Sequence, residues 1–387
     1  MSGERSLKEK LLEKRPHLIL IFIPILFTII FGAVMSPVYV ENIPLAVFDR
    51  DQSSKSRAIV DCFYDCPTFS VREDFETEEE IEEAMLEGDV KGALLIPEGF
   101  DKELSGKTGG ETLLLIDGTN FLVGNNIQLY GSTILAMAGA EVQMKMLEAG
   151  GMVPYMAEES VYTMNIADRV LYNPELGYFY YLFAALLGLF VQQTIMAVTP
   201  AILIQEKNRL KKGQRQHRVG EVKLKSLPVA QKIGAYAGLN TFSALVCLIV
   251  ANQWFDYPLK GNLGYFLLIH SIFLLCCLGV SLVLAAIFDD VTHCIQFVMF
   301  LAIPTILTCG YGWPEYMMAP GFAPVVKILW PLYYYVNPMK DLMLKGAGYS
   351  VIGHYIVGGI LFAACWIPAG LFLFHRKITL LKAVEIK

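Results

Sequence analysis

The sequence predicts a membrane protein: a six-helix α transmembrane bundle with an α/β (α+β) extracytoplasmic domain inserted between the first and second spans. Two observations predict this class. Six apolar runs approach the ~20 residues that a helix needs to cross the hydrocarbon core, and a polar, acidic stretch separates the first run from the other five. The composition agrees, because 55% hydrophobic and 18% charged residues make the chain too apolar for an ordinary soluble domain.

The apolar runs place the six spans along the chain. We expect them at residues 18–39, 177–204, 233–253, 263–287, 291–312 and 352–374. The first run could instead be a signal peptide, but it exceeds the usual core of about 7–15 residues, and no clean A-x-A cleavage site follows it. We therefore expect an uncleaved anchor. Residues 1–17, which mix leucines with Lys and Glu, predict a short amphipathic helix on the cytoplasmic surface.

The distribution of charged residues predicts the orientation. Basic residues precede the first span and follow the last one, and the 205–232 loop carries nine Lys and Arg against two acids. By the positive-inside rule, both termini, this loop and the tail 375–387 are cytoplasmic. The segment 40–176, which is rich in acidic residues, then lies outside a plasma (inner) membrane. The pair Asp289-Asp290 falls in a cytoplasmic turn and does not fit the pattern, although acids contribute little to the rule.

Residues 40–176 predict a compact domain in which strands alternate with helices. Strands are expected at 43–48, 69–71, 90–96 and 113–116, and helices at 53–64 and 78–87. Residues 120–149 predict one long helix or a pair of helices. Thr77 and Glu80 form a capping box that opens the second helix, and Gly88 is its expected end. Residues 150–172 return the chain to the membrane.

Two cysteines of this domain, Cys62 and Cys66, lie four residues apart at a predicted helix end. Outside an inner membrane they could form a disulfide, but this spacing on an unbroken helix is marginal for the required Cα separation. A bridge and two free thiols therefore both stay open. The other six cysteines lie in or beside spans, and no metal-ligand spacing appears among them.

One segment resembles the end of a phosphate-binding loop. Gly106-Lys107-Thr108 would need a glycine five residues before Gly106, where the chain has Asp101. No strand immediately precedes the segment. We expect a surface turn there, no nucleotide site and no cofactor in this chain.

Four segments, in chain order, resemble the motifs of a known family. Residues 49–57 read D-x-D-x-S-x-x-S-R, 88–100 read G-x-V…I-P-x-G-F, 117–120 read D-G-x-N and 172–175 read Y-N-P-E. Together with the topology, they resemble the integral-membrane permeases of ABC transporters of the ABC-2 type. The segment 313–350 resembles the external re-entrant region of that family. The resemblance implies a permease with no catalytic residues, and a separate cytoplasmic ATPase that uses ATP-Mg.

Such permeases contact their ATPase through the loop after the second span. The resemblance implies ATPase-coupling residues at Glu206, Lys207, Arg209, Lys211, Gly213, Leu224 and Pro228. The chain departs here from the usual R-E-K-E-x-G-T-x-E, because the Gly-Thr-x-Glu core is absent. The basic residues could instead anchor the chain to anionic lipid, at about 1 kcal/mol for each Lys or Arg.

Polar side chains within or near the spans are candidates for a substrate pathway. They are Gln192, Gln193, Thr194, Asn240, His270 and Gln296. Such groups are costly in lipid and usually face the interior of the bundle. Hydrogen bonding between helices explains any single one of them more simply than substrate contact.

The sequence thus predicts the permease subunit of an ABC exporter, which forms the pathway for ATP-driven outward transport of an apolar or amphipathic substrate such as a drug or a lipid. The expected partners are a cytoplasmic ABC ATPase, a second permease copy, membrane lipid and, by family analogy, a periplasmic adaptor and an outer-membrane channel. No nucleic-acid role follows from the basic run. Two rival classes are a receptor or scaffold whose outer domain binds a ligand without transport, and an intramembrane enzyme.

Overall fold

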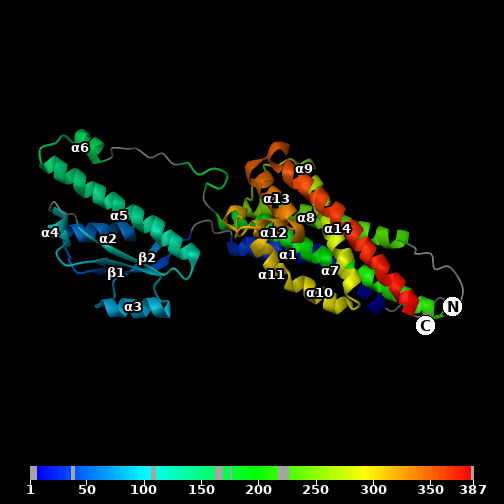
Figure 1. The fold of residues 1–387 in the computed structure, drawn as a ribbon. Helices are drawn as coiled ribbons and strands as arrows, with labels where there is room; N and C mark the ends of the chain where they lie inside the picture. Colours follow the sequence, from blue (N-terminus) through cyan, green and yellow to red (C-terminus); the bar gives the residue numbers. More distant parts are fainter. Residues whose placement is uncertain are drawn as a thin grey trace. The chain divides into compact units, whose positions relative to one another are not determined.

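The computed structural model describes residues 7–35, 40–105, 110–161, 169–174, 177–216 and 226–384. The chain forms two compact units. One unit is Tyr39–Arg169, and the other combines Met1–Val38 with Val170–Lys387. Each unit has its own hydrophobic core, so we describe them separately (Figure 1).

The unit Tyr39–Arg169 is built on a four-stranded mixed sheet. Its strands are β1 (Ile43–Asp49), β2 (Phe69–Arg72), β3 (Gly92–Ile96) and β4 (Leu113–Ile116). The strand order is β2-β1-β3-β4, in which β1 is parallel to both neighbours and β3 is antiparallel to β4. The two central strands are therefore the buried ones, and their apolar sequences fit that position.

Helices cover both faces of this sheet (Figure 1). They are α2 (Ser54–Tyr64), α3 (Glu78–Glu87), α4 (Phe100–Ser105), α5 (Phe121–Ala149) and α6 (Pro154–Val161). Successive residues of a strand point to opposite faces. Leu45 accordingly packs with Phe63 of α2 and Ile127 of α5, whereas the next residue, Ala46, packs with Ile81 of α3. The sheet thus has one core on each face.

Local capping explains where α3 begins and ends. The Thr77 hydroxyl accepts a hydrogen bond from the Glu80 amide at 3.2 Å. The Glu80 carboxylate reaches back to the amide of Glu76 at 2.8 Å, one residue before the position that a capping box uses. The helix ends at Gly88, whose φ of 87° suits glycine.

The second unit is helical in its described residues. Its elements are α1 (Leu7–Met35), α7 (Tyr178–Gln216), α8 (Ser226–Phe255), α9 (Leu263–Ile287), α10 (Val291–Phe300), α11 (Ala302–Thr308), η1 (Glu315–Met317), α12 (Phe322–Leu329), α13 (Tyr333–Lys345) and α14 (Tyr349–Val384). Five stretches of the described residues are long and apolar enough to cross a membrane: Tyr178–Arg209, Val229–Phe255, Leu263–Ile287, Val291–Thr308 and Tyr349–Thr379. A sixth apolar helix, Leu20–Met35, is shorter. The chain is therefore a multi-pass membrane protein.

The ends of these helices differ from the sequence prediction. Helix α1 runs unbroken from Leu7, so 7–17 is not a separate surface helix. Residues 205–216 continue α7 and 226–232 open α8, so most of the predicted 205–232 loop is helical. The predicted tail likewise continues α14 as far as Val384. Hydropathy predicts only the part of a helix that lies in lipid. Lys, Arg, Gln and Glu are good helix formers, so a helix can continue beyond the membrane into water.

The predicted fifth span and the region after it are also less regular than expected. The span breaks at Leu301 into α10 and α11, and residues 313–350 form the short elements η1, α12 and α13 before α14 begins. Polar contacts hold this region. Glu315 pairs with Lys327 and accepts a hydrogen bond from the Tyr333 hydroxyl at 2.8 Å.

Helices α9 and α14 pack closely because glycines lie between them. A Cβ at Gly279 would lie 2.8 Å from the Cβ of Trp366, and one at Gly370 would lie 2.6 Å from the Cβ of Leu282. Real Cβ atoms do not approach so closely, so these positions require glycine for this spacing. Small residues at helix contacts are typical of packing in membranes.

Candidate functional site

The predicted coupling residue Lys207 is buried at the end of the apolar part of α7. Its ammonium donates hydrogen bonds to the carbonyl oxygens of Ala285 and Phe288, each at 2.6 Å. It also forms an ion pair with Asp289 at 2.9 Å. The last carbonyls of a helix have no partner within it and carry partial negative charge. We call this arrangement the Lys207 cap, because it closes the C-terminus of α9.

Asp289 links the Lys207 cap to other helices. Its backbone carbonyl accepts a hydrogen bond from the Asn208 side chain at 3.1 Å, and its carboxylate lies 3.8 Å from the ammonium of Lys377 on α14. Asp290 has a separate role, because it caps α10 by accepting from the His293 amide at 3.0 Å. Asp289 therefore pairs with the lysine that caps α9, and Asp290 itself caps α10, which explains why two acids stand in this turn.

The other predicted coupling residues take different positions. The Glu206 side chain is 24% exposed and lies 3.6 Å from the guanidinium of Arg209, which is 82% exposed. Lys211 and Gly213 lie on α7 and Pro228 on α8, but only their backbone is described, and Leu224 lies outside the described residues. The side chain of Lys207 is fully buried, whereas that of Arg209 is accessible to a partner chain.

The predicted pathway residues do not form one cluster of contacts. Asn240 on α8 donates a hydrogen bond to the Thr194 hydroxyl on α7 at 3.1 Å. His270 on α9 instead pairs with the Tyr335 hydroxyl of α13 at 3.2 Å. Gln296 on α10 is exposed on this chain. Of the six residues, the described hydrogen bonds join only Thr194 with Asn240.

Several of these buried polar groups lack a hydrogen-bond partner among the described residues. They are Gln192 Oε1, both amide atoms of Gln193, Asn240 Oδ1 and His270 Nε2. An unsatisfied buried polar group costs about 1–3 kcal/mol, so such groups are usually paired with water or a ligand. The core of this unit therefore offers hydrogen-bonding capacity at depth.

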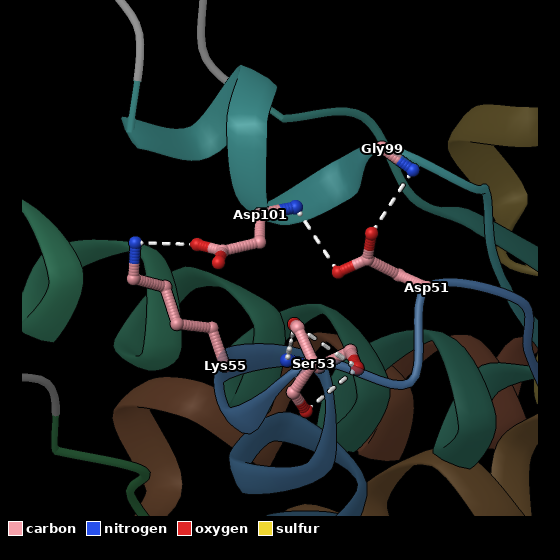
Figure 2. A network of polar contacts seen from close by, with 6 residues as sticks. Asp51, Ser53, Lys55, Gly99 and Asp101 are labelled. Atoms are coloured by element: carbon pink, nitrogen blue, oxygen red, sulfur yellow. Dashed lines mark hydrogen bonds and ion pairs between the residues drawn. The ribbon is translucent and has the colours of Figure 1, made fainter.

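A second polar site lies at the carboxyl end of β1 in the other unit. One carboxylate oxygen of Asp51 accepts from the Gly99 amide at 2.9 Å, and the other accepts from the Asp101 amide at 3.1 Å. Figure 2 shows Asp51 between these two amides. We call this the Asp51 cap, because it satisfies free N–H groups at the start of α4.

Neighbouring residues extend this network. The ammonium of Lys55 lies 2.6 Å from the Asp101 carboxylate (Figure 2). The Asp49 carboxylate accepts a hydrogen bond from the Ser56 hydroxyl at 2.6 Å and one from the Asp51 amide at 3.0 Å. The segment 49–57 and the end of the motif at 88–100 are thus joined by these hydrogen bonds, although they are separate motifs in the sequence.

The two cysteines of the α/β unit are not bridged to each other. Cys62, which is exposed, and Cys66, which is half-buried, are both free thiols. The pKa of the Cys62 thiol is raised, first by desolvation and then by the carboxylates of Glu141, Asp65 and Asp61. Residues 106–108 lie outside the described part of the chain. The described residues contain no cluster of His, Cys, Asp or Glu that could hold a metal ion.

Comparison with known proteins decides the family. A profile of the "ABC-2 family transporter protein" matches residues 17–372. The chain belongs to the ABC-2 family of transporter proteins. It is 22% identical over 377 residues to the "Probable multidrug ABC transporter permease YbhR" of Escherichia coli strain K12, and equally to that of strain O157:H7, with 97% of each chain covered. It is also 30% identical over 103 residues to the "ABC transporter G family member 20" of Dictyostelium discoideum, covering 27% of this chain and 14% of that protein.

The family assignment fits the geometry of the helical unit. An ABC-2 permease is a membrane-transport protein, and the five long apolar helices are consistent with it. The sequence motifs found the family, but they missed the structural role of Lys207, whose partners lie 78 and 81 residues later in the chain. A signal was available: a lysine at the end of one span and an acidic pair at the end of another.

Proposed function

We propose that this chain is the permease subunit of an ABC exporter and moves an apolar or amphipathic substrate outward. In this proposal the chain has six spans, of which the helix around Leu20–Met35 is the first. Both termini are cytoplasmic in a plasma (inner) membrane, and Tyr39–Arg169 faces outside. The chain itself performs no catalysis, and a separate ATPase subunit hydrolyses ATP-Mg.

The Lys207 cap is the observation that carries the mechanism. It fixes α7 to the end of α9 at Ala285 and Phe288, and Asp289 extends the contact to α14 through Lys377. Beyond this point α7 continues with exposed Arg209 and further basic residues to Gln216. A push by the ATPase on this extension would move α7, α9 and α14 together. The transport step would then be a shift between two packed states of the helices.

The proposed pathway uses the buried polar groups of the bundle. Gln192, Gln193 and Asn240 retain unpaired polar atoms, which a passing substrate or water could satisfy while the apolar walls contact its body. His270 is a more remote candidate, because it is already paired with Tyr335. These groups would lie beside the route, and the hydrogen bond between Thr194 and Asn240 would hold α7 and α8 together.

The partners follow from what the single chain leaves uncovered. Exposed apolar residues recur every fourth position along α1, at Phe22, Leu26, Ile30 and Val34. This face is suited to lipid or to a second permease copy, in a homodimer or a heterodimer. The α/β unit would receive the substrate or pass it to a periplasmic adaptor and an outer-membrane channel, a step that rests on family analogy.

The proposal is tested by purifying the full-length chain gently from its native membranes and identifying partners by mass spectrometry. We expect a P-loop ATPase to co-purify with the wild type and to be lost when Arg209→Glu and Lys211→Glu are combined. Lys145→Glu is the matched control, because Lys145 is 71% exposed in the α/β unit, on the opposite side of the membrane in this proposal. This control should retain the ATPase.

Either of two results would overturn the proposal. Recovery of the chain without any ATPase at every detergent strength would favour the receptor or scaffold. Loss of the ATPase in Lys145→Glu but not in the double variant would contradict the proposed orientation. If the ATPase is recovered, reconstituted vesicles measure direction: ATP supplied on the side of the basic extension should drive an amphipathic dye toward the side of the α/β unit.

A further inference from the structure

We propose that a groove lined by α7, α8, α9 and α14 is a binding site for an amphipathic organic cation, a molecule with one protonated amine on an apolar body. The groove has a volume of about 500 Å³. Its charged group is Glu206, which the family resemblance had suggested only as a coupling residue. A transport role for this site rests on the proposed function above, whereas binding itself does not.

The walls of the groove are almost entirely apolar. Apart from Glu206 and Thr199, the residues that line it are aliphatic, aromatic or glycine. Leu203 lines the α7 side, Ile233 the α8 side, Leu278 the α9 side and Phe374 the α14 side. Pockets for drug-sized ligands typically measure about 300–1,000 Å³ and combine apolar walls with a few polar groups. The groove has the size and the lining of such a pocket.

Glu206 is the charged residue among those that line the groove. Its side chain is 24% exposed, and it lies in the turn of α7 that follows Leu203. Among the described residues, the ion pair it makes is with Arg209 at 3.6 Å, and the side chain of Arg209 is 82% exposed. A pair with so exposed a partner holds a carboxylate weakly. The carboxylate therefore remains able to receive a second cation from the groove.

Charge complementarity selects the ligand. A carboxylate beside apolar walls favours an ammonium group and disfavours an anion, because like charges repel more strongly where water is excluded. A neutral apolar molecule would fill the walls but leave Glu206 without a ligand contact. The headgroup of an anionic lipid would be repelled by the Glu206 carboxylate. The combination of one carboxylate with a long apolar wall thus fits a monocationic amphiphile.

The structure offers a matched pair of substitutions to block the groove. Gly234 and Ala235 are neighbouring exposed residues of α8, and a Cβ added at Gly234 meets no atom within 4 Å. Gly234 lines the groove, whereas Ala235 is not among its lining residues and points about 100° away around the helix. Gly234→Phe therefore places a ring in the groove, and Ala235→Phe directs the same ring away from it. Both changes introduce the same side chain on the same helix.

The test measures binding to the full-length chain in nanodiscs, without nucleotide and without the ATPase. The probe is N-dansyl-1,10-diaminodecane, which has one ammonium at the end of an apolar chain. Its N-acetylated form is the neutral counterpart, and empty nanodiscs give the background.

We expect Glu206→Gln to weaken binding of the cationic probe about ten-fold or more, as loss of a charge-assisted contact does. The Kd of the neutral probe should stay within two-fold. Gly234→Phe should abolish binding of both probes, and Ala235→Phe should change neither.

Three results would overturn the inference. The first is a cationic probe whose Kd stays within two-fold in Glu206→Gln. The second is equal loss of binding in Gly234→Phe and Ala235→Phe. The third is a phospholipid that native mass spectrometry finds on the wild type but not on Gly234→Phe, while the probe does not compete with it. Because no ATPase is present, binding can succeed when ATPase recovery fails, and the reverse, so the two proposals are tested separately.

Discussion

Each unit of the molecule has a helix end that is capped by a charged side chain, but the two charges have opposite signs and the two side chains are buried to different degrees. In the α/β unit, the Asp51 carboxylate caps the amides at the start of α4. In the helical unit, the Lys207 ammonium caps the carbonyls at the end of α9. Each sign matches the partial charge of the helix end that it contacts. The chemistry is the same, but Asp51 is half-buried near water and Lys207 is fully buried.

This difference in burial determines what each cap can do. A half-buried carboxylate can exchange its two amide partners for water, so its loss is felt locally. Water cannot replace a buried ammonium. Removal of the Lys207 ammonium therefore takes a hydrogen-bond donor from two carbonyl oxygens and an ion-pair partner from Asp289. The Asp51 cap therefore serves to join two segments of one small unit. The Lys207 cap joins α7 to the end of α9 through a buried charged contact.

The largest effect is expected from Lys207→Met. The substitution keeps an apolar stem but leaves the carbonyls of Ala285 and Phe288 without their donor. Breaking a buried charged pair costs about 3–5 kcal/mol, and we expect about 3 kcal/mol here because the Asp289 side chain is 52% exposed. The measurement is the unfolding midpoint of the purified full-length chain in detergent with increasing denaturant.

Arg209→Met is the control for this experiment. It removes a basic residue from the same helix, two residues away, at a site that is 82% exposed. Substitutions at such surface sites usually change stability by no more than about 0.5 kcal/mol. Equal destabilisation by the two variants would contradict the Lys207 cap and would point to a general effect of charge on α7.

A smaller and more local effect is expected from Asp51→Ala. Hydrogen bonds to charged groups contribute about 1.5–3 kcal/mol, and we expect the lower part of that range because Asp51 is only half-buried. The readout is hydrogen exchange of the Gly99 and Asp101 amides in the full-length chain. Both should exchange faster, while those of α3 stay unchanged. Glu98→Gln, an exposed change in the same turn, should leave the exchange as in the wild type.

Three helices of the α/β unit, α2, α3 and α5, were predictable because their signals are local, whereas the short α4 and α6 were not predicted. Thr77, Glu80 and Gly88 lie within the turns that they begin or end, and the structure has α3 between Thr77 and Gly88. Asn120 similarly caps α5 with its own side chain. Each signal involves neighbours within a few residues, so the sequence contains it in full. The order of the strands was not available in this way, since pairing depends on distant residues.

The ends of the helices of the other unit were not predictable from hydropathy. The apolar run predicts where α7 lies in lipid, but the basic residues that follow it form a helix as readily in water. The prediction of coupling residues had a different limit. Glu206 and Lys207 are adjacent in sequence, yet one side chain lines a groove and the other is buried against α9. Adjacent helical residues point in directions about 100° apart, so their roles are decided by packing that the sequence does not state.

The next effect in size concerns the outer part of the Lys207 cap. Lys377 contacts the same Asp289 as Lys207, but at 3.8 Å and with a side chain that is 36% exposed. Exposed ion pairs contribute about 0–1 kcal/mol. Lys377→Met should therefore lower the unfolding free energy by less than a third of the Lys207→Met effect in the same denaturant titration. If the two variants are equally destabilising, the carboxylate of Asp289 and not the α9 carbonyls carries the stability of the cap.

The smallest effect is a pH dependence at the turn between β4 and α5. The pKa of Asp117 is lowered, first by the Thr119 hydroxyl, then by the Thr119 amide, and further by Lys91. A depressed pKa in the folded state stabilises the turn above the unfolded-state value of about 3.9, and this contribution is lost as the pH falls through the folded value. The Thr119 amide, 2.9 Å from the Asp117 carboxylate, should keep its hydrogen-exchange protection at pH 6 and lose it near pH 2.

Two variants test the cause of the lowered pKa. Thr119→Val should move this loss of protection to higher pH. Thr119→Ser should not, since serine keeps the hydroxyl that holds the carboxylate ionised. A midpoint that is the same in all three proteins would show that the hydroxyl does not set the pKa, leaving the amide and Lys91 as its cause.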